Sequence, residues 1–194
     1  MDFGTSYGLA LSSGLNAYLP LLALAASSRW LHLYKINPDF SYITQDWFMI
    51  VLAILALADL FADKIPGVDH VWDAIHTVLR PIAGALVAAA SGGTASGASV
   101  PINLLVGGAL AGMVHTTKAT TRVASTATTA GTLNIFVSIF EDFLVVIGVI
   151  CSLFFPIVMT IVVVIFIAIF LFMVPRIVRL FTRRRRRSAT LGTN

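Results

Sequence analysis

Glu141 and Asp142 lie side by side inside the most apolar stretch of the chain, residues 133–174. A carboxylate in hydrocarbon costs about 2.5–3.5 kcal/mol on insertion scales, so two adjacent ones require compensating partners. Ionisable residues at membrane depth typically serve ion pathways, proton relays or substrate binding. Glu141 is therefore the residue from which a functional hypothesis starts.

The neighbours of Glu141 along the chain share its face. Asn134, Ser138 and Glu141 follow i, i+4, i+7 spacing, which places them on one side of a helix. Asp142 points about 100° away from that side. We therefore expect Asp142 to meet a different neighbour.

A second polar face carries the compensating cations. His115, Lys118 and Arg122 follow i, i+3, i+7 spacing on another predicted helix. The simplest compensating arrangement pairs Glu141 with either His115 or Lys118. By the same reasoning Asp59 pairs with Lys64 or Arg80.

All these polar residues map to one leaflet once the predicted spans are placed, and they outline a hydrated pocket that faces the cytoplasm. The candidate ligand or ion pathway comprises Asn16, Asp59, Asp63, Lys64, Arg80, His115, Lys118, Arg122, Asn134, Ser138, Glu141 and Asp142.

Two other interpretations remain open. The same residues could be structural ion pairs that lock the bundle without any ligand. A metal site could use Asp59, Asp63, His115 and Glu141, but HxxxH, CxxC and EF-hand spacings are absent and the nearby cations oppose it. Because GxSxG, HExxH, Walker A and Rossmann patterns are absent too, we expect neither an enzyme nor a cofactor.

The composition places the chain in a membrane. Of its 194 residues 58% are hydrophobic and 11% are charged, against about 25% charged residues in soluble domains. The single cysteine, Cys151, excludes an internal disulfide. The first residues lack a basic region, so we expect no cleaved signal peptide.

The apolar segments predict an all-α integral membrane protein with six transmembrane helices. The first runs from Gly4 to Ala26 and the second from Trp47 to Phe61. The third, which begins after Pro81, is short, tilted, re-entrant or shielded, because residues 91–97 are polar. The fourth begins at Pro101, and residues 133–174 form a hairpin of two spans that turns near residues 152–156.

Between the second and third spans, residues 63–80 read as an amphipathic helix at the cytoplasmic interface. Its polar face carries Asp69, Asp73, His76 and Arg80. A connector that only packs on the lipid headgroups is the alternative.

The basic residues orient the predicted spans. With both termini in the cytoplasm, eleven Lys and Arg residues lie inside and only Arg29 and Lys35 lie outside. We expect residues 1–175 to form one membrane domain and 176–194 a basic tail, disordered after 188. The tail arginines that we expect to bind anionic phospholipids, rather than nucleic acid, are Arg176, Arg179, Arg183, Arg184, Arg185, Arg186 and Arg187.

Small residues predict where helices pack closely. Gly84, Ala88 and Gly92 follow small-xxx-small spacing, as do Gly108 and Gly112. Helices in lipid associate through close backbone approach, so the third and fourth spans are expected at the tightly packed centre. Such glycine-rich faces also allow a homodimer.

Five segments together resemble an uncharacterised family of small bacterial multi-pass membrane proteins, domain of unknown function 4126. The segments are GLNAYLPLL (14–22), ADKIPGVD (62–69), RPIAGAL (80–86), HTTKATTR (115–122) and SIFED (138–142). The likeness covers about residues 4–155 and implies a bacterial inner-membrane location.

The resemblance implies which residues matter together, but it supplies no activity. These residues are Asp63, Lys64, Pro66, Asp69, Arg80, His115, Lys118, Arg122, Ser138, Glu141 and Asp142. This chain has Ile135 where the family pattern has a proline, so the helix entry there differs.

Three functions follow from these patterns, in decreasing order of support. The first is a transporter or channel-like protein for an unknown small solute or ion, with Glu141 as a proton- or cation-sensitive gate. The second is a non-catalytic protein that binds anionic lipid headgroups or acts as a scaffold. The third is a membrane enzyme acting on a lipid phosphate.

Overall fold

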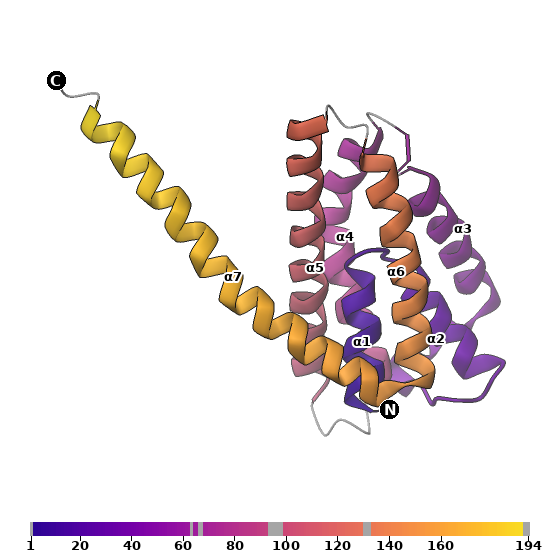
Figure 1. Cartoon of the computed structure of the whole chain (residues 1–194). Coiled ribbons are helices and arrows are strands. Elements are labelled where there is room, and N and C mark those ends of the chain that lie inside the picture. Colours follow the sequence, from indigo (N-terminus) through magenta and orange to yellow (C-terminus); the bar gives the residue numbers. More distant parts are fainter. Residues whose placement is uncertain (1, 63, 66–67, 93–98, 130–132, 192–194) are drawn as a thin grey trace.

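The structure, a computed structural model, is a bundle of helices (Figure 1). It describes residues 2–62, 64–65, 68–92, 99–129 and 133–191, with the side chains of these residues except 68–70, 128, 174–175 and 177–191. The helices are α1 (Phe3–Ser13), α2 (Leu19–Arg29), η1 (Pro38–Thr44), α3 (Asp46–Ala62), α4 (Val68–Gly92), α5 (Val100–Thr129), α6 (Asn134–Phe154) and α7 (Pro156–Leu191). The all-α prediction is confirmed for the described residues.

α1 and α2 form a short hairpin inside the bundle. The N-terminal part of α1 touches the start of α7, because a Cβ at Gly4 would overlap the carbonyl of Pro156. After α2 the chain returns to the same place, where the Tyr34 hydroxyl donates a hydrogen bond to the carbonyl of Leu153. Both outer ends of the hairpin therefore lie at one end of the bundle, which we call the α6–α7 end (Figure 1).

This hairpin corrects the predicted first span, Gly4 to Ala26. α1 and α2 have 11 residues each, about 16 Å of helix, roughly half the hydrocarbon core. The side chain of Asn16 ends the first helix and starts the second by accepting hydrogen bonds from the backbone N–H groups of Tyr18 and Leu19, at 3.0 and 2.8 Å. Pro20 then occupies the first turn of α2, where a missing N–H costs nothing.

The six predicted spans are not all found. Among the described residues, four helices are long and apolar enough to span a membrane, at 71–92, 100–127, 134–154 and 156–173. The bent pair of η1 and α3, which meet at 66°, makes a fifth if counted as one span. The chain is thus a membrane-embedded multi-pass protein with four to five candidate spans.

The predicted hairpin of residues 133–174 is confirmed, with Phe155 between α6 and α7. α7 starts beside the N-terminal part of α1 and leads obliquely away from the bundle toward the level of its other end (Figure 1). The structure therefore does not place the two termini at the same end. α7 remains helical to Leu191, and residues 192–194 lie outside the description.

α4 is one continuous helix, which corrects the predicted interfacial helix before Pro81. Pro81 lies inside α4, and prolines are tolerated within membrane helices where neighbours satisfy the freed carbonyl. The apolar side of the segment, with Val71, Ile75 and Val78, is exposed on the outside of the bundle. The polar side, with His76 and Arg80, is fully buried. The amphipathic pattern thus turns its apolar face toward lipid and its polar face inward.

The most extensive contact between helices joins α4 and α5, as the glycines predicted. A Cβ at Gly84 would lie 2.7 Å from the carbonyl oxygen of Gly107, and one at Gly107 would overlap the Gly84 carbonyl. A Cβ at Gly108 or Gly112, the predicted pair, would meet neighbouring atoms at slightly tight or ordinary distances. The close approach on α5 is therefore at Gly107, one residue before the predicted Gly108. α1 packs against this core and against α6 and α7.

Gly84→Ala is expected to destabilise the protein by about 1–3 kcal/mol, because backbone of α5 must move to admit the new methyl group. The matched control is Gly112→Ala, whose Cβ would lie 3.7 Å from the Pro81 side chain. Removing a helical glycine there is expected to be neutral or stabilising by about 0.4–1 kcal/mol. Thermal unfolding in detergent measures both, and equal effects would contradict the packing argument.

Candidate functional site

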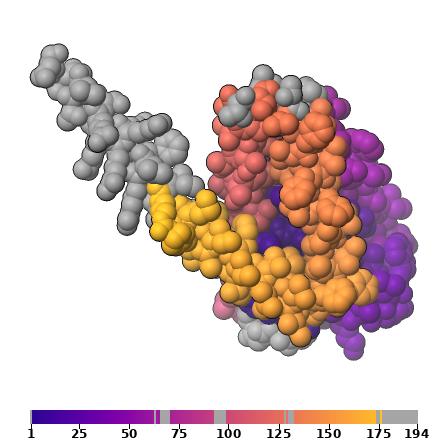
Figure 2. Space-filling view, in the orientation of Figure 1, coloured from indigo at the N-terminus to yellow at the C-terminus, as the bar shows by residue number. Residues whose placement is uncertain are grey.

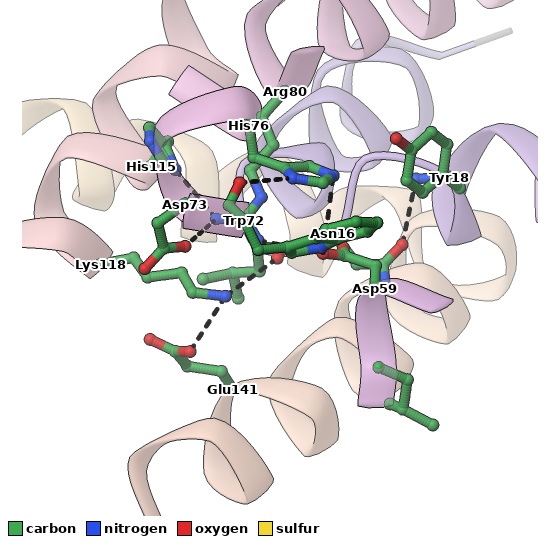
Figure 3. A network of polar contacts seen from close by, with 12 residues as sticks. Asn16, Tyr18, Asp59, Trp72, Asp73, His76, Arg80, His115, Lys118 and Glu141 are labelled. Atoms are coloured by element: carbon green, nitrogen blue, oxygen red, sulfur yellow. Dashed lines mark hydrogen bonds and ion pairs between the residues drawn. The ribbon is translucent and has the colours of Figure 1, made fainter. Parts of the chain in front are cut away.

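Ionisable side chains from α3, α4, α5 and α6 converge inside the bundle (Figure 3). They lie toward the end where α3 ends and α4 begins, which we call the polar end. The buried network, as we name it, consists of Asp59, His76, Arg80, His115, Lys118, Arg122 and Glu141, with the partly buried Trp72 and Asp73 and the exposed Thr77 at its edge.

Asp59, near the end of α3, accepts contacts from the polar face of α4. Its Oδ1 atom accepts a hydrogen bond from Trp72 Nε1 at 2.7 Å and lies 3.3 Å from Arg80 Nη2. His76 Nε2 lies 3.6 Å from the same oxygen. The predicted pairing of Asp59 with Arg80 is therefore confirmed.

Arg80 connects the two halves of the network. Its Nη1 atom lies 3.4 Å from Asp73 Oδ1 and 2.9 Å from His115 Nδ1. The other ring nitrogen of His115 lies 3.1 Å from the hydroxyl of Thr77. His115 thus contacts α4 rather than Glu141.

The Glu141 carboxylate contacts two basic side chains of α5, Lys118 and Arg122. Its Oε2 atom lies 3.2 Å from both Lys118 Nζ and Arg122 Nη2. Arg122 also binds Asp73, with Nη1 3.1 Å from Oδ2. Of the two predicted partners of Glu141, the structure selects Lys118, and it adds Arg122.

The charges of the network balance among the described side chains. The three cations Arg80, Lys118 and Arg122 face the three carboxylates Asp59, Asp73 and Glu141. Burying one unpaired charge costs several kcal/mol, whereas a fully hydrogen-bonded set is tolerated. These ion pairs offset part of the cost of placing so many charges inside the bundle.

Asp142 forms a separate ion pair with Lys64, with Oδ2 and Nζ 2.5 Å apart. The prediction that Asp142 meets a different neighbour from Glu141 is confirmed. Lys64 was one of the two predicted partners of Asp59. That pairing is wrong, because Lys64 follows the end of α3 and turns toward Asp142 of α6. The pair is about a quarter exposed.

The turn of the α1–α2 hairpin reaches the network. Lys118 Nζ lies 3.5 Å from the carbonyl oxygen of Leu15. The next residue, Asn16, lines a pocket of about 360 Å³ between α2, α3 and α6, together with Asp142. The turn between α1 and α2 therefore contacts the buried network and shares a pocket with Asp142.

Asn134 and Ser138 lie on the Glu141 face of α6, as the spacing predicted. The amide nitrogen of Asn134 donates to the hydroxyl of Thr126 at 3.0 Å. The Ser138 hydroxyl is fully buried and has no hydrogen-bond partner among the described residues. These groups supply polar atoms beside the Glu141 carboxylate.

A larger cavity of about 510 Å³ opens between α1, α5, α6 and α7. Figure 2 shows it as the hollow between α5 and α6 in which the indigo surface of α1 is visible. Its walls are mostly apolar, and its polar part comes from Ser12, Thr117, Lys118, Thr121 and Glu141. Since most network side chains are buried and paired, they do not surround the wide hydrated pocket that the sequence suggested.

Some predicted residues cannot be placed. Asp63 and the side chain of Asp69 lie outside the described residues, as do the side chains of Arg179 and Arg183 to Arg187. Arg176 is described and stacks 3.3 Å above the ring centre of Phe172. The described residues hold no cluster of three His, Cys, Asp or Glu residues suited to a metal ion.

Sequence reasoning missed the parts played by Trp72, Asp73, His76 and Thr77. Asp73 and His76 were assigned to a membrane surface, and the other two were not singled out. The available signal was spacing, because Asp73, His76, Thr77 and Arg80 follow i, i+3, i+4, i+7 on one face. That pattern fits an inward polar face as well as an outward one.

The comparison with sequence families identifies the class of protein. The family DUF4126, described as a domain of unknown function, matches residues 3–176. The chain therefore belongs to this family, as its motifs indicated. No curated protein and no solved structure matches it.

Proposed function

We propose that this protein is a small membrane transporter whose substrate, an ion or polar solute, passes through the buried network beside the α1–α2 hairpin. The observation that carries the proposal is the contact between the turn of this hairpin and the Lys118–Glu141 ion pair. Broken helices that meet at mid-membrane commonly form substrate and ion sites in transporters. Intramembrane charges support the same reading, because their cost is rarely incurred for stability alone.

The network has the properties of a switch. Arg122 binds carboxylates from α4 and α6, and Arg80 binds carboxylates from α3 and α4. A substrate ion that replaced one carboxylate or one cation would therefore loosen one helix from the others. Alternating access requires this kind of bistable contact between parts of a bundle.

The charge distribution supports an orientation with the polar end in the cytoplasm. Replacing the predicted first span with a hairpin moves only the N-terminus, which carries no Lys or Arg before Arg29. Arg80, Lys118 and Arg122 lie within candidate spans and are left out of the loop count. Lys64 and the seven tail arginines then lie inside against Arg29 and Lys35 outside, eight to two. In our proposal the C-terminal tail is therefore cytoplasmic and the N-terminus lies outside, in the inner membrane of a bacterium.

Reconstituted flux tests the proposal. Proteoliposomes are loaded with a panel of labelled inorganic ions and small organic acids and amines, and uptake is compared with empty liposomes. Wild-type protein is expected to move at least one of them, and Glu141→Gln to lower that flux by about tenfold or more, the effect of losing about 1.4 kcal/mol. Asp39→Asn, which neutralises an exposed carboxylate outside the network, serves as control. Absence of wild-type flux across the panel contradicts the proposal.

The mostly apolar cavity favours a second candidate, the binding of an amphiphile with an anionic headgroup near Lys118. Lys118 lines this cavity, whereas Arg80 and Arg122 are buried and bound to carboxylates. A lipid that copurifies with wild-type protein and is lost in Lys118→Met, without any flux, would favour this candidate over transport.

A further inference from the structure

His76 lies where its two ring nitrogens meet two different acceptors. Its Nδ1 atom lies 2.8 Å from the carbonyl oxygen of Trp72, one turn earlier in α4. Its Nε2 atom faces Asp59 Oδ1 at 3.6 Å. Both His76 and Asp59 are buried, with at most 1% of either residue exposed.

This geometry constrains where protons lie. A carbonyl oxygen only accepts hydrogen bonds, so Nδ1 must carry a hydrogen. In a neutral imidazole Nε2 then holds a lone pair, which would face the carboxylate oxygen of Asp59. The contact becomes favourable when one further proton sits between His76 Nε2 and Asp59.

The surroundings of Asp59 favour an added proton on the histidine side. Trp72 Nε1 and Arg80 Nη2 already donate to Oδ1, which is the arrangement of an ionised carboxylate. The second oxygen, Oδ2, is buried without a hydrogen-bond partner among the described residues.

Groups from each neighbouring helix face the pair. The Tyr18 ring, at the entry of α2, lies 5.7 Å from the His76 ring in an edge-on contact. The charged or titratable groups near the pair are Tyr18 at the start of α2 and Asp73 and Arg80 of α4. His115 of α5 contacts Arg80 and not the pair itself.

Glu141 is less suited to this exchange. Its Oε2 atom accepts from Lys118 and Arg122, each at 3.2 Å. This oxygen already contacts two cations, and no histidine contacts Glu141 among the described residues. The proton-sensitive role expected for Glu141 therefore fits the Asp59–His76 pair better.

We propose that Asp59 and His76 form a proton-binding site, so that substrate movement through the buried network is coupled to protons. This inference rests on the proposed transport function for its coupling role but not for the site itself. Proton binding places the proton on His76 Nε2, where Asp59 Oδ1 holds it. Release returns it to water and leaves the two groups without an attractive contact, which frees the end of α3 from α4.

Nitrogen-15 NMR of labelled histidine tests the site directly. The chain has four histidines, and the His76 signals are assigned as those lost in His76→Gln. We expect both ring nitrogens of His76 to be protonated at low pH and Nε2 alone to lose its proton within a range of about pH 5 to 9. Asp59→Asn is expected to abolish the protonated form, because an amide nitrogen can donate to Nε2. Exposed His32 serves as the internal control in every sample.

An Nε2 signal that does not change over this pH range overturns the proposal, whether the nitrogen is protonated throughout or bare throughout. If His76→Gln does not fold, assignment proceeds by replacing the other three histidines one at a time. If the site titrates as expected but no solute moves in proteoliposomes, the proposed transport function fails and the proton site stands.

Coupling has its own measurement. Where flux is found, an imposed pH gradient is expected to drive uptake in wild-type vesicles, and a pH dye inside reports accompanying proton movement. His76→Gln is expected to lose the uptake that the gradient drives, whereas the control Asp39→Asn, exposed and outside the network, is expected to keep it. Gradient-driven uptake that persists in His76→Gln contradicts the coupling role.

Discussion

Arg80→Met is expected to leave little folded protein in the membrane. Arg80 is fully buried and lies within 3.4 Å of Asp59, Asp73 and His115. Removing Arg80 deprives the carboxylates of Asp59 and Asp73 of the cation that they share. Breaking a buried ion pair in this way costs about 3–5 kcal/mol, a large part of the 5–15 kcal/mol typical of folded proteins. Yield and thermal unfolding after detergent extraction measure the loss.

The chain provides a matched control for this substitution. Arg29 also pairs with an aspartate, Asp46, at 2.8 Å, but their side chains are 36% and 75% exposed. An exposed pair contributes about 0.2–1 kcal/mol, so Arg29→Met is expected to fold almost normally. Similar losses for the two variants would show that burial of Arg80 is not what makes its ion pairs matter.

If α1 and α2 form a hairpin, the two residues that flank it must lie on the same side of the membrane. Phe3 and Lys35 flank the hairpin and are exposed, so single cysteines at these positions are expected to react from the same side with a membrane-impermeant maleimide. Leu133, exposed at the polar end, is expected to react only from the opposite side. The background carries Cys151→Ala, which removes the native thiol.

Labelling in intact and permeabilised cells separates this topology from the one that hydropathy alone suggests. A continuous first span would place Phe3 and Lys35 on opposite sides. Reaction of the two cysteines from different sides would therefore contradict the hairpin. A variant that fails to react even after permeabilisation is replaced by its neighbour, Asp2→Cys or Leu33→Cys, both of which are exposed.

Helical periodicity predicted much of the candidate site. It placed Ser138 on the Glu141 face and directed Asp142 toward another partner, and both follow from the 100° step between residues. Periodicity also supplied Lys118 and Arg80 as partners of the carboxylates. It could not decide that Arg122 reaches Glu141 while Lys64 reaches Asp142, because those choices depend on how the helices rotate against each other.

The hairpin was harder to foresee because hydropathy and capping signals conflicted. Residues 4–26 are long and apolar enough for one span, which favours a single helix. Gly14, Asn16 and Pro20 carry the opposite signal, a helix end followed by a new start. The structure follows the capping signal, because Asn16 satisfies two backbone N–H groups that would otherwise be buried without partners.

The misassigned segment before Pro81 shows a limit of amphipathic patterns. One face of residues 71–80 is apolar and the other polar, which describes a helix on a membrane surface as well as a helix at the edge of a bundle. The choice depends on partners elsewhere in the chain. Asp59 and Arg122 supply them for the polar face, whereas lipid suits the apolar face.

The central claim is that the buried charges beside the hairpin move a substrate rather than only hold the bundle together. The double variant Lys118→Met with Glu141→Gln removes one cation and one carboxylate that contact each other, so the network stays balanced and the fold is expected to persist. The decisive measurement is flux through proteoliposomes of this double variant, with folding checked by its unfolding temperature. The transport account predicts a folded protein whose flux falls to that of empty liposomes. Wild-type flux in the folded double variant would contradict it and leave the ion pair a structural role.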